Sequence, residues 1–166
     1  MAKSRRQLVR RSNIGSRDEA VGMKCYIDRL ERFSAQYGAH VLRHSLEMQI
    51  SGRLEGRCIV LRAGMTPEQQ VLTLVHELTH LIAHSDARPG LNRTICEYEA
   101  EAVERWVGAE LGVAPYDAEN LDASSVTDDL LACSVVRVRF AARTLVRAAR
   151  GASISAVRRP DPGSAL

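Results

Sequence analysis

The sequence predicts one α+β domain in which about four helices pack against a small sheet of two to three strands. Apolar residues recur every three or four positions in four segments, which is typical of helices, and at shorter spacing between the first two segments. The chain has 166 residues, enough for one domain with its own core. Its 45% apolar and 26% charged residues are typical of soluble globular proteins and exclude collagen-like or wholly disordered chains.

The N-terminal part of the domain is predicted to contain one helix and then the strands. Residues 18–37 follow a helical pattern, and Gly38 is a natural helix stop. Residues 41–50 then alternate between apolar and polar, a turn-rich segment spans 51–56, and 58–61 form a short apolar run. This order predicts a β-hairpin or a meander of two or three strands.

The second helix carries three signals in its first turn. Thr66 is a suitable N-cap, Pro67 fits the first helical position, and Gln69 completes a capping box. Apolar residues surround most of this helix up to about His84, so we expect it to be buried.

Two further helices are predicted in the C-terminal half of the chain. One spans about 93–111 and is followed by a loop at 117–123. Ser125 or Thr127 then caps the last helix, which reaches about 149–150 before a glycine.

Charge is distributed unevenly along the chain, although its net value is only +3. Residues 1–17 carry six basic side chains and no acidic one, and 137–166 carry seven arginines and one acid. Residues 18–136 hold 10 basic and 19 acidic side chains. The basic ends predict either solubilising termini or weak contact with nucleic acid that does not depend on base sequence.

We expect the ends to be a basic disordered arm (1–16) and a disordered tail (151–166) around one domain (17–150). No segment is long and apolar enough to cross a membrane, and the arginine pair near the N-terminus lacks the apolar stretch of an export signal. Four widely spaced cysteines without a CxxC pair are typical of buried, reduced thiols. These features predict a cytoplasmic protein without membrane contact.

The second helix contains His76-Glu77-Leu78-Thr79-His80, the HExxH pattern of zinc hydrolases. Histidines four residues apart lie on one helix face, so both imidazoles can reach one ion, and Glu77 can take a proton from an activated water. The alternative is a chance pattern in the core. However, two unliganded imidazoles and a carboxylate in an apolar helix would carry a desolvation cost. We therefore predict a catalytic zinc site with His76 and His80 as ligands and Glu77 as the catalytic base.

A third ligand is expected from the acidic segment of the following helix. Glu97, Glu101 and Glu104 share one helical face, whereas Glu99 points about 160° away from Glu101. We assign Glu97 as the metal ligand and Glu101 as the carboxylate that accepts the second N–H of a metal-bound histidine; the alternative is that Glu101 is the third ligand. A solvated helix face is expected for Glu99 and is the alternative for Glu104.

Three other histidines are less suited to the same ion. His84 continues the spacing but is about 12 Å along the helix from His76, so we expect it to cap the helix C-terminus or to line the cleft. His40 and His44 lie near the predicted strands, and we expect them to be exposed or hydrogen-bonded.

These two helices resemble those of a known family. Residues 74–84 (LVHELTHLIAH) and 97–103 (EYEAEAV) are similar to the ImmA/IrrE-type zincin-like metallopeptidase family, and within it to the phage- and mobile-element-associated ArdC-like antirestriction branch. The segments 56–61 and 65–71 also fit, as a strand that leads into the metal-binding helix. The resemblance covers about residues 18–150.

The resemblance implies a gluzincin-type zincin-like fold with one zinc ion held by His76, His80 and Glu97, and with Glu77 as the base. Family members include peptidases that cleave specific regulatory proteins, such as repressors, and others that are fused to DNA-binding domains. The implied activity is that of a zinc metallo-endopeptidase, and the implied partner is a regulatory protein that serves as substrate.

Two functions follow from these features. The first is zinc-dependent peptide hydrolysis, which needs a donor for the oxyanion; Tyr98, Tyr116, His84 and Arg93 are candidates. The second is a non-catalytic, zinc-stabilised binding module of a phage or mobile element, acting in antirestriction or on DNA. A structural zinc site needs no general base and usually has a fourth protein ligand, so Glu77 favours the peptidase.

Overall fold

The computed structural model describes residues 15–84, 93–113 and 128–152. These ranges hold four helices and a three-stranded sheet, which confirms the predicted α+β class. Most of the expected arm and tail lie outside the described residues, as do the loop at 117–123 and the predicted cap. The elements are α1 (Gly15–Gln36), β1 (His40–His44), β2 (Gly52–Glu55), β3 (Cys58–Arg62), α2 (Pro67–Ala83), α3 (Arg93–Leu111) and α4 (Asp128–Ala149).

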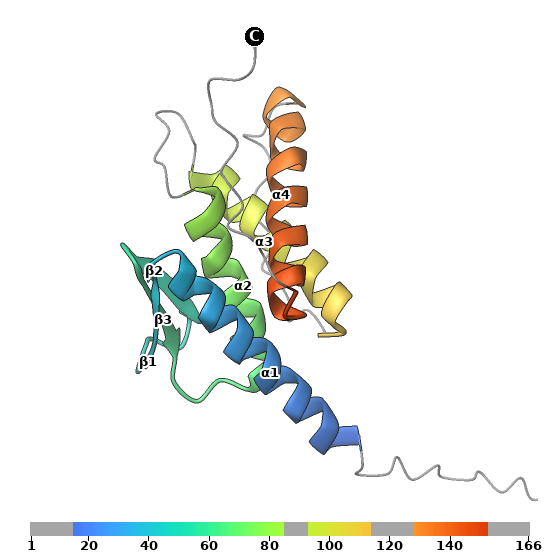
Figure 1. The fold of residues 1–166 in the computed structure, drawn as a ribbon. Helices are drawn as coiled ribbons and strands as arrows, with labels where there is room; N and C mark the ends of the chain where they lie inside the picture. Colours follow the sequence, from blue (N-terminus) through green and yellow to red (C-terminus); the bar gives the residue numbers. More distant parts are fainter. Residues whose placement is uncertain (1–14, 85–92, 114–127, 153–166) are drawn as a thin grey trace, which may run out of the picture.

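Helix α2 lies at the centre of the fold and contacts α1, α3, α4, β2 and β3 (Figure 1). Its apolar side chains are almost completely shielded from solvent, which confirms the prediction of a buried helix. They are Val71, Leu72, Leu74, Val75, Leu78 and Leu81. The polar residues that interrupt this series are therefore also held inside the domain, and Glu77 is only 6% exposed.

The first turn of α2 is closed by the predicted capping box. The Thr66 hydroxyl accepts a hydrogen bond from the backbone N–H of Gln69, and the Gln69 side chain accepts one from the backbone N–H of Thr66. Pro67 follows in the first turn, where no intrahelical donor is needed. The capping box therefore sets where the helix begins.

The sheet is mixed, with the strand order β1-β3-β2. β2 and β3 form a hairpin that turns at Gly56 with a φ of 60°. The prediction of a turn over residues 51–56 is wrong in part, because β2 occupies residues 52–55 of that segment. β1 runs parallel to β3, so the predicted meander is wrong. The reason is that β3 is the buried strand, with Ile59 and Leu61 fully enclosed, and a strand on each side satisfies both of its edges.

The predicted extension of the first strand to residue 50 is also wrong. β1 ends at His44, and Met48, whose alternation suggested a strand, is 84% exposed. An alternating pattern indicates a strand only where one face is buried, and this segment has no covered face at Met48.

Helix α3 packs along α2 in the opposite direction. Gly108 near the end of α3 permits this close approach, because a Cβ there would lie 3.1 Å from Cδ2 of Leu72 near the start of α2. The first turns of α3 consequently lie beside the second half of α2. This arrangement places the acidic segment of α3 against the two histidines.

Helices α1 and α4 cover the remaining sides of α2. α1 begins at Gly15, three residues before the expected start at Asp18, and α4 ends at Ala149 as expected. The Arg29 guanidinium donates a hydrogen bond of 3.1 Å to the carbonyl oxygen of Ala149, which ties the two helices together.

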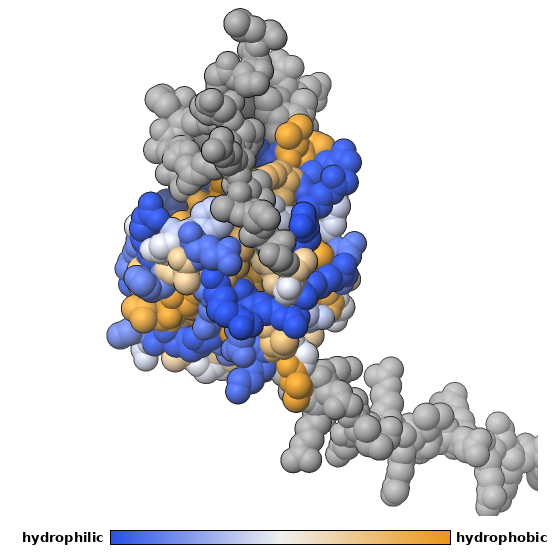
Figure 2. Space-filling view, in the orientation of Figure 1, coloured by the Kyte–Doolittle hydropathy of each residue, from blue (hydrophilic) through white to orange (hydrophobic). Residues whose placement is uncertain are grey.

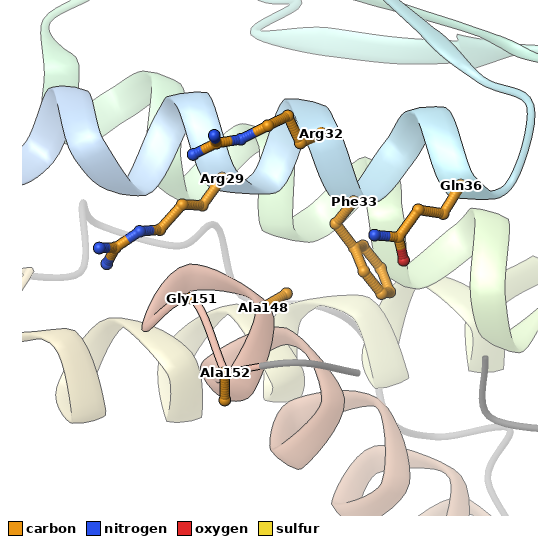
Figure 3. A pocket seen from close by; sticks show the side chains of 7 residues that line it. All are labelled: Arg29, Arg32, Phe33, Gln36, Ala148, Gly151 and Ala152. Carbon is orange, nitrogen blue, oxygen red and sulfur yellow. The ribbon is translucent and has the colours of Figure 1, made fainter. Parts of the chain in front are cut away.

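A cleft of about 350 Å³ lies between α1 and the end of α4 (Figure 3). It is lined by Arg29, Arg32, Phe33, Gln36, Ala148, Gly151 and Ala152. The lining contains no histidine, thiol or carboxylate and none of the predicted site residues. The cleft therefore has no group suited to the predicted hydrolysis.

The surface and the thiols agree with an ordinary globular domain. The face seen in Figure 2 is mainly hydrophilic, with apolar residues scattered among polar ones. Within the described ranges, no helix has the length and apolar character needed to span a membrane. Cys25, Cys58 and Cys96 are free thiols, although they are half-buried rather than fully buried.

The capping box leads to a stability prediction. We expect Thr66→Ala to lower the free energy of unfolding by about 1 kcal/mol, because the N–H of Gln69 loses its acceptor. Thr66→Ser keeps the hydroxyl and should stay close to the parent. Urea denaturation of the three proteins measures the difference, and equal stability of the alanine and serine variants would contradict the role of the cap.

Candidate metal centre

Three predicted ligands, His76, His80 and Glu97, meet between α2 and α3. Nε2 of His76 lies 3.2 Å from Nε2 of His80. Oε2 of Glu97 lies 3.3 Å from the first of these nitrogens and 3.5 Å from the second. Tetrahedral zinc with ligand distances of about 2.0–2.1 Å places neighbouring donor atoms about 3.4 Å apart. The three atoms therefore fit one face of a zinc coordination tetrahedron.

This arrangement leaves a fourth coordination position without a protein ligand among the described residues. No other histidine, cysteine or carboxylate in those ranges joins the group of His76, His80 and Glu97. Catalytic zinc sites have three protein ligands and one open position, whereas structural sites have four. The donor set thus fits a catalytic rather than a structural zinc ion.

The second nitrogen of His76 faces Glu104, not Glu101. Nδ1 of His76 lies 3.3 Å from Oε2 of Glu104. Glu101 pairs instead with Arg105, one turn further along α3, at 3.4 Å. The assignment of Glu101 as the carboxylate behind a histidine is therefore wrong. On a helix of 3.6 residues per turn, Glu104 lies about 20° around the axis from Glu97, and Glu101 lies about 40° from Glu97 in the opposite direction. This difference follows from the positions of the three residues in the sequence.

The second nitrogen of His80 faces His84. The two Nδ1 atoms are 3.2 Å apart, and Nε2 of His84 lies 2.8 Å from Oε2 of Glu99. His84 is also the C-cap residue of α2, as expected from its position. The expectation that Glu99 lies on a solvated face is wrong, because this residue is 2% exposed. Glu99 faces α4, where Arg137 binds it, and no local pattern links residues so far apart in the sequence.

The predicted base, Glu77, lies beside this group and against strand β2. A Cβ built on Gly52 of β2 would lie 2.5 Å from Cγ2 of Thr73 and 3.3 Å from Oε1 of Glu77, so glycine lets the strand approach α2 next to the carboxylate. Burial raises the pKa of Glu77, while the charges of His76 and His80 act in the opposite direction. Gly52 was not predicted as a site residue, since a lone glycine in a strand gives no sign of what it approaches.

The protonation of the site is controlled by its carboxylates. Burial alone would lower the pKa of His76, but hydrogen bonds with Glu104 and Glu97 and the charge of Glu77 raise that pKa to about 10. The same contacts with His76 and His80 hold the pKa of Glu97 well below its usual range, against the effect of burial. In the absence of a cation, His76 is therefore protonated at neutral pH.

The candidate oxyanion donors are placed differently. Nε of Arg93 lies 3.8 Å from Oε1 of Glu97, and the Arg93 side chain is 93% exposed. His84 is turned toward Glu99 and has both ring nitrogens engaged, so its assignment as an oxyanion donor is wrong. Tyr98 is half-buried on α3. Tyr116 lies outside the described residues.

The two histidines near the sheet lie apart from this group. His40 and His44 are the first and last residues of β1, and both are exposed, as expected. Neither belongs to the cluster of donor atoms that could hold an ion.

Comparison with known proteins identifies the family of the chain. Residues 31–143, more than half of the chain, match the IrrE N-terminal-like domain family, Peptidase_M78. The chain belongs to this family. No curated protein and no solved structure matches it.

Membership of the IrrE N-terminal-like family has two consequences. It confirms the resemblance drawn from the two helices, and it identifies the protein as metallopeptidase-like in general terms. The matched range contains the three ligand residues, Glu77 and the first part of α4. The narrower likeness to the ArdC-like branch stays a prediction.

The two neighbouring carboxylates of α3 are expected to differ in their effect on zinc binding. Glu104→Ala should weaken zinc affinity by about 10- to 100-fold, the usual cost of removing the partner of a zinc-bound histidine. Glu101→Ala removes the same charge three residues earlier and should leave affinity almost unchanged. Competition with a chromophoric chelator measures both constants. Equal losses in the two variants would show that only the negative charge of the helix matters.

Zinc binding is also expected to release a proton. His76 is charged at neutral pH because its pKa is raised to about 10, and a zinc ligand must be neutral. Apparent zinc affinity should therefore increase with pH below that pKa, by about tenfold per pH unit for one released proton. Calorimetric titration in two buffers with different ionisation enthalpies counts the protons, and identical heats would rule out the release.

Proposed function

We propose that this protein is a zinc-dependent endopeptidase that hydrolyses peptide bonds of a specific regulatory protein, with Glu77 as the general base. One observation carries the proposal. The donor atoms of His76, His80 and Glu97 are 3.2 to 3.5 Å apart and form one face of a tetrahedron, and no further ligand for its fourth position lies among the described residues. The family supports hydrolysis of peptide bonds. The substrate class rests on the resemblance of residues 74–84 and 97–103 to a family that includes repressor-cleaving peptidases.

The residues around the ligands are suited to proton transfer. A zinc ion bound there would supply a Lewis acid for the scissile carbonyl and would make water more acidic. Glu77 takes the proton of the attacking water and delivers it to the leaving amine. Its raised pKa makes the carboxylate a stronger base, and no side chain in the described ranges donates a hydrogen bond to its oxygens. Its lone pairs are therefore free for the water.

The substrate is proposed to bind along strand β2. This strand is at one edge of the sheet and pairs only with β3 in the described part of the chain. Its outer N–H and C=O groups can therefore pair with an extended peptide. Because Gly52 brings β2 against Glu77, a peptide added to this edge would pass next to the base.

The alternative is a zinc-stabilised binding module that does not hydrolyse its partner. A purely structural zinc site would not require a carboxylate at position 77. Burying Glu77 has a desolvation cost that a structural role would not offset, so this residue favours the peptidase over the binding module. Weak contact with nucleic acid through the basic ends is compatible with either function. Most residues of these ends lie outside the described ranges.

A paired experiment tests the proposed hydrolysis. The zinc-loaded parent and Glu77→Gln are incubated with a library of peptides made from a bacterial proteome, and new termini are identified by mass spectrometry. The parent should produce termini that are absent after treatment with a chelator. Glu77→Gln should bind zinc at parental stoichiometry, but its turnover should fall at least about 100-fold, because the amide cannot take the proton.

The two functions predict different outcomes for this pair. Cleavage that persists in Glu77→Gln would overturn the mechanism. No cleavage by the zinc-loaded parent, together with unchanged zinc binding in both proteins, would favour the binding module.

A further inference from the structure

A continuous series of hydrogen bonds leads from the metal centre to helix α4. It begins at Nδ1 of His80, passes through both ring nitrogens of His84 and reaches the carboxylate of Glu99. From there it continues to Arg137 and Ser134 of α4. The side chains of His84 and Glu99 are 6% and 2% exposed. The centre of the series is therefore almost completely shielded from water, whereas its ends, His80 and Arg137, are 18% and 26% exposed.

The ends of this series determine where its protons lie. When Nε2 of His80 is a metal ligand, a neutral imidazole carries its proton on Nδ1 and donates it. Nδ1 of His84, 3.2 Å away, must then be the acceptor. A neutral His84 consequently carries its proton on Nε2 and donates it to Oε2 of Glu99 at 2.8 Å. One pair of tautomers satisfies every contact.

Helix α4 keeps the carboxylate of Glu99 in place and balances its charge. Nε of Arg137 lies 2.9 Å from each Glu99 oxygen, a second guanidinium nitrogen also donates, and the Ser134 hydroxyl donates at 2.6 Å. The carboxylate therefore accepts hydrogen bonds and has no need of a full positive charge on His84.

We infer that His84, Glu99 and Arg137 are positioning residues that hold His80 in the ring orientation and tautomer required for metal binding. This inference rests on the metal centre of the proposed function. It assigns to α4 a part in metal affinity, although α4 supplies none of the three ligands. The two ligand histidines are thus supported differently, His76 by one carboxylate of α3 and His80 through a second imidazole and an ion pair.

Three variants of His84 and a surface control test the inference. His84→Leu fills the site but removes both hydrogen bonds. His84→Gln retains one acceptor for His80 and one donor for Glu99 in a single amide. His44→Leu makes the same change at an exposed histidine of β1, outside the ligand group. The dissociation constant for Zn²⁺ is measured for each by chelator competition, and the thermal midpoint is measured for each metal-free protein.

Positioning and a purely structural role give different results. We expect His84→Leu to weaken zinc binding by about 10- to 100-fold, His84→Gln to recover most of this loss, and His44→Leu to match the parent. Parental zinc affinity in His84→Leu would overturn the inference. The inference would also be overturned if His84→Gln bound zinc as weakly as His84→Leu while metal-free His84→Gln kept the parental thermal midpoint.

A second measurement reads the tautomers directly. In the zinc-loaded protein, long-range ¹H–¹⁵N correlation spectra of the histidine rings should show the proton of His80 on Nδ1 and that of His84 on Nε2. Arg137→Met, which removes the tie to α4, should broaden or shift the His84 and His80 signals but not those of His76. A proton on Nδ1 of His84, or signals unaffected by Arg137→Met, would refute the series.

These readouts do not depend on peptidase activity. If the parent binds no zinc, the metal centre of the proposed function fails. If it binds zinc and hydrolyses no peptide, only the catalytic proposal fails, and the measurements on His84 remain decisive.

Discussion

The antiparallel contact between α2 and α3 is the constraint on which the rest of the structure depends. Helix α2 provides two imidazoles on one face, but a catalytic zinc site has three protein ligands. Glu97 completes the set only because α3 runs beside α2 at a distance that Gly108 and Leu72 allow. A change of crossing angle or axial position by one turn, about 5.4 Å, would carry the carboxylate away from both Nε2 atoms.

The same contact explains how an apolar core helix tolerates two imidazoles. Each inward-facing imidazole of α2 has a hydrogen-bonding partner on both of its nitrogens: His76 with Glu97 and Glu104, His80 with Glu97 and His84. Unpaired, these groups would be costly to bury. The acidic side chains of α3 therefore contribute to the packing of α2, independently of any catalytic role.

Local features of the sequence were sufficient for α2 and its histidines. The capping box from Thr66 and the HExxH spacing depend on residues within two turns, and Glu97 followed from the acidic face of the next helix. The parallel pairing of β1 with β3 and the burial of Glu99 by Arg137 depend on partners many residues away, which no local pattern specifies. The spacing puts Glu104 slightly nearer than Glu101 to Glu97 around the helix axis, but the contact of Glu104 with His76 also depends on how α3 is rotated against α2.

Gly52 has a consequence for selectivity. The edge of β2 beside Glu77 presents only main-chain groups at this point, and every polypeptide offers the same main-chain groups in return. Docking at this edge would discriminate by extended shape, not by side-chain identity. A folded protein seldom exposes such a stretch, so the accessibility of a flexible segment in the target would govern which bond is cut.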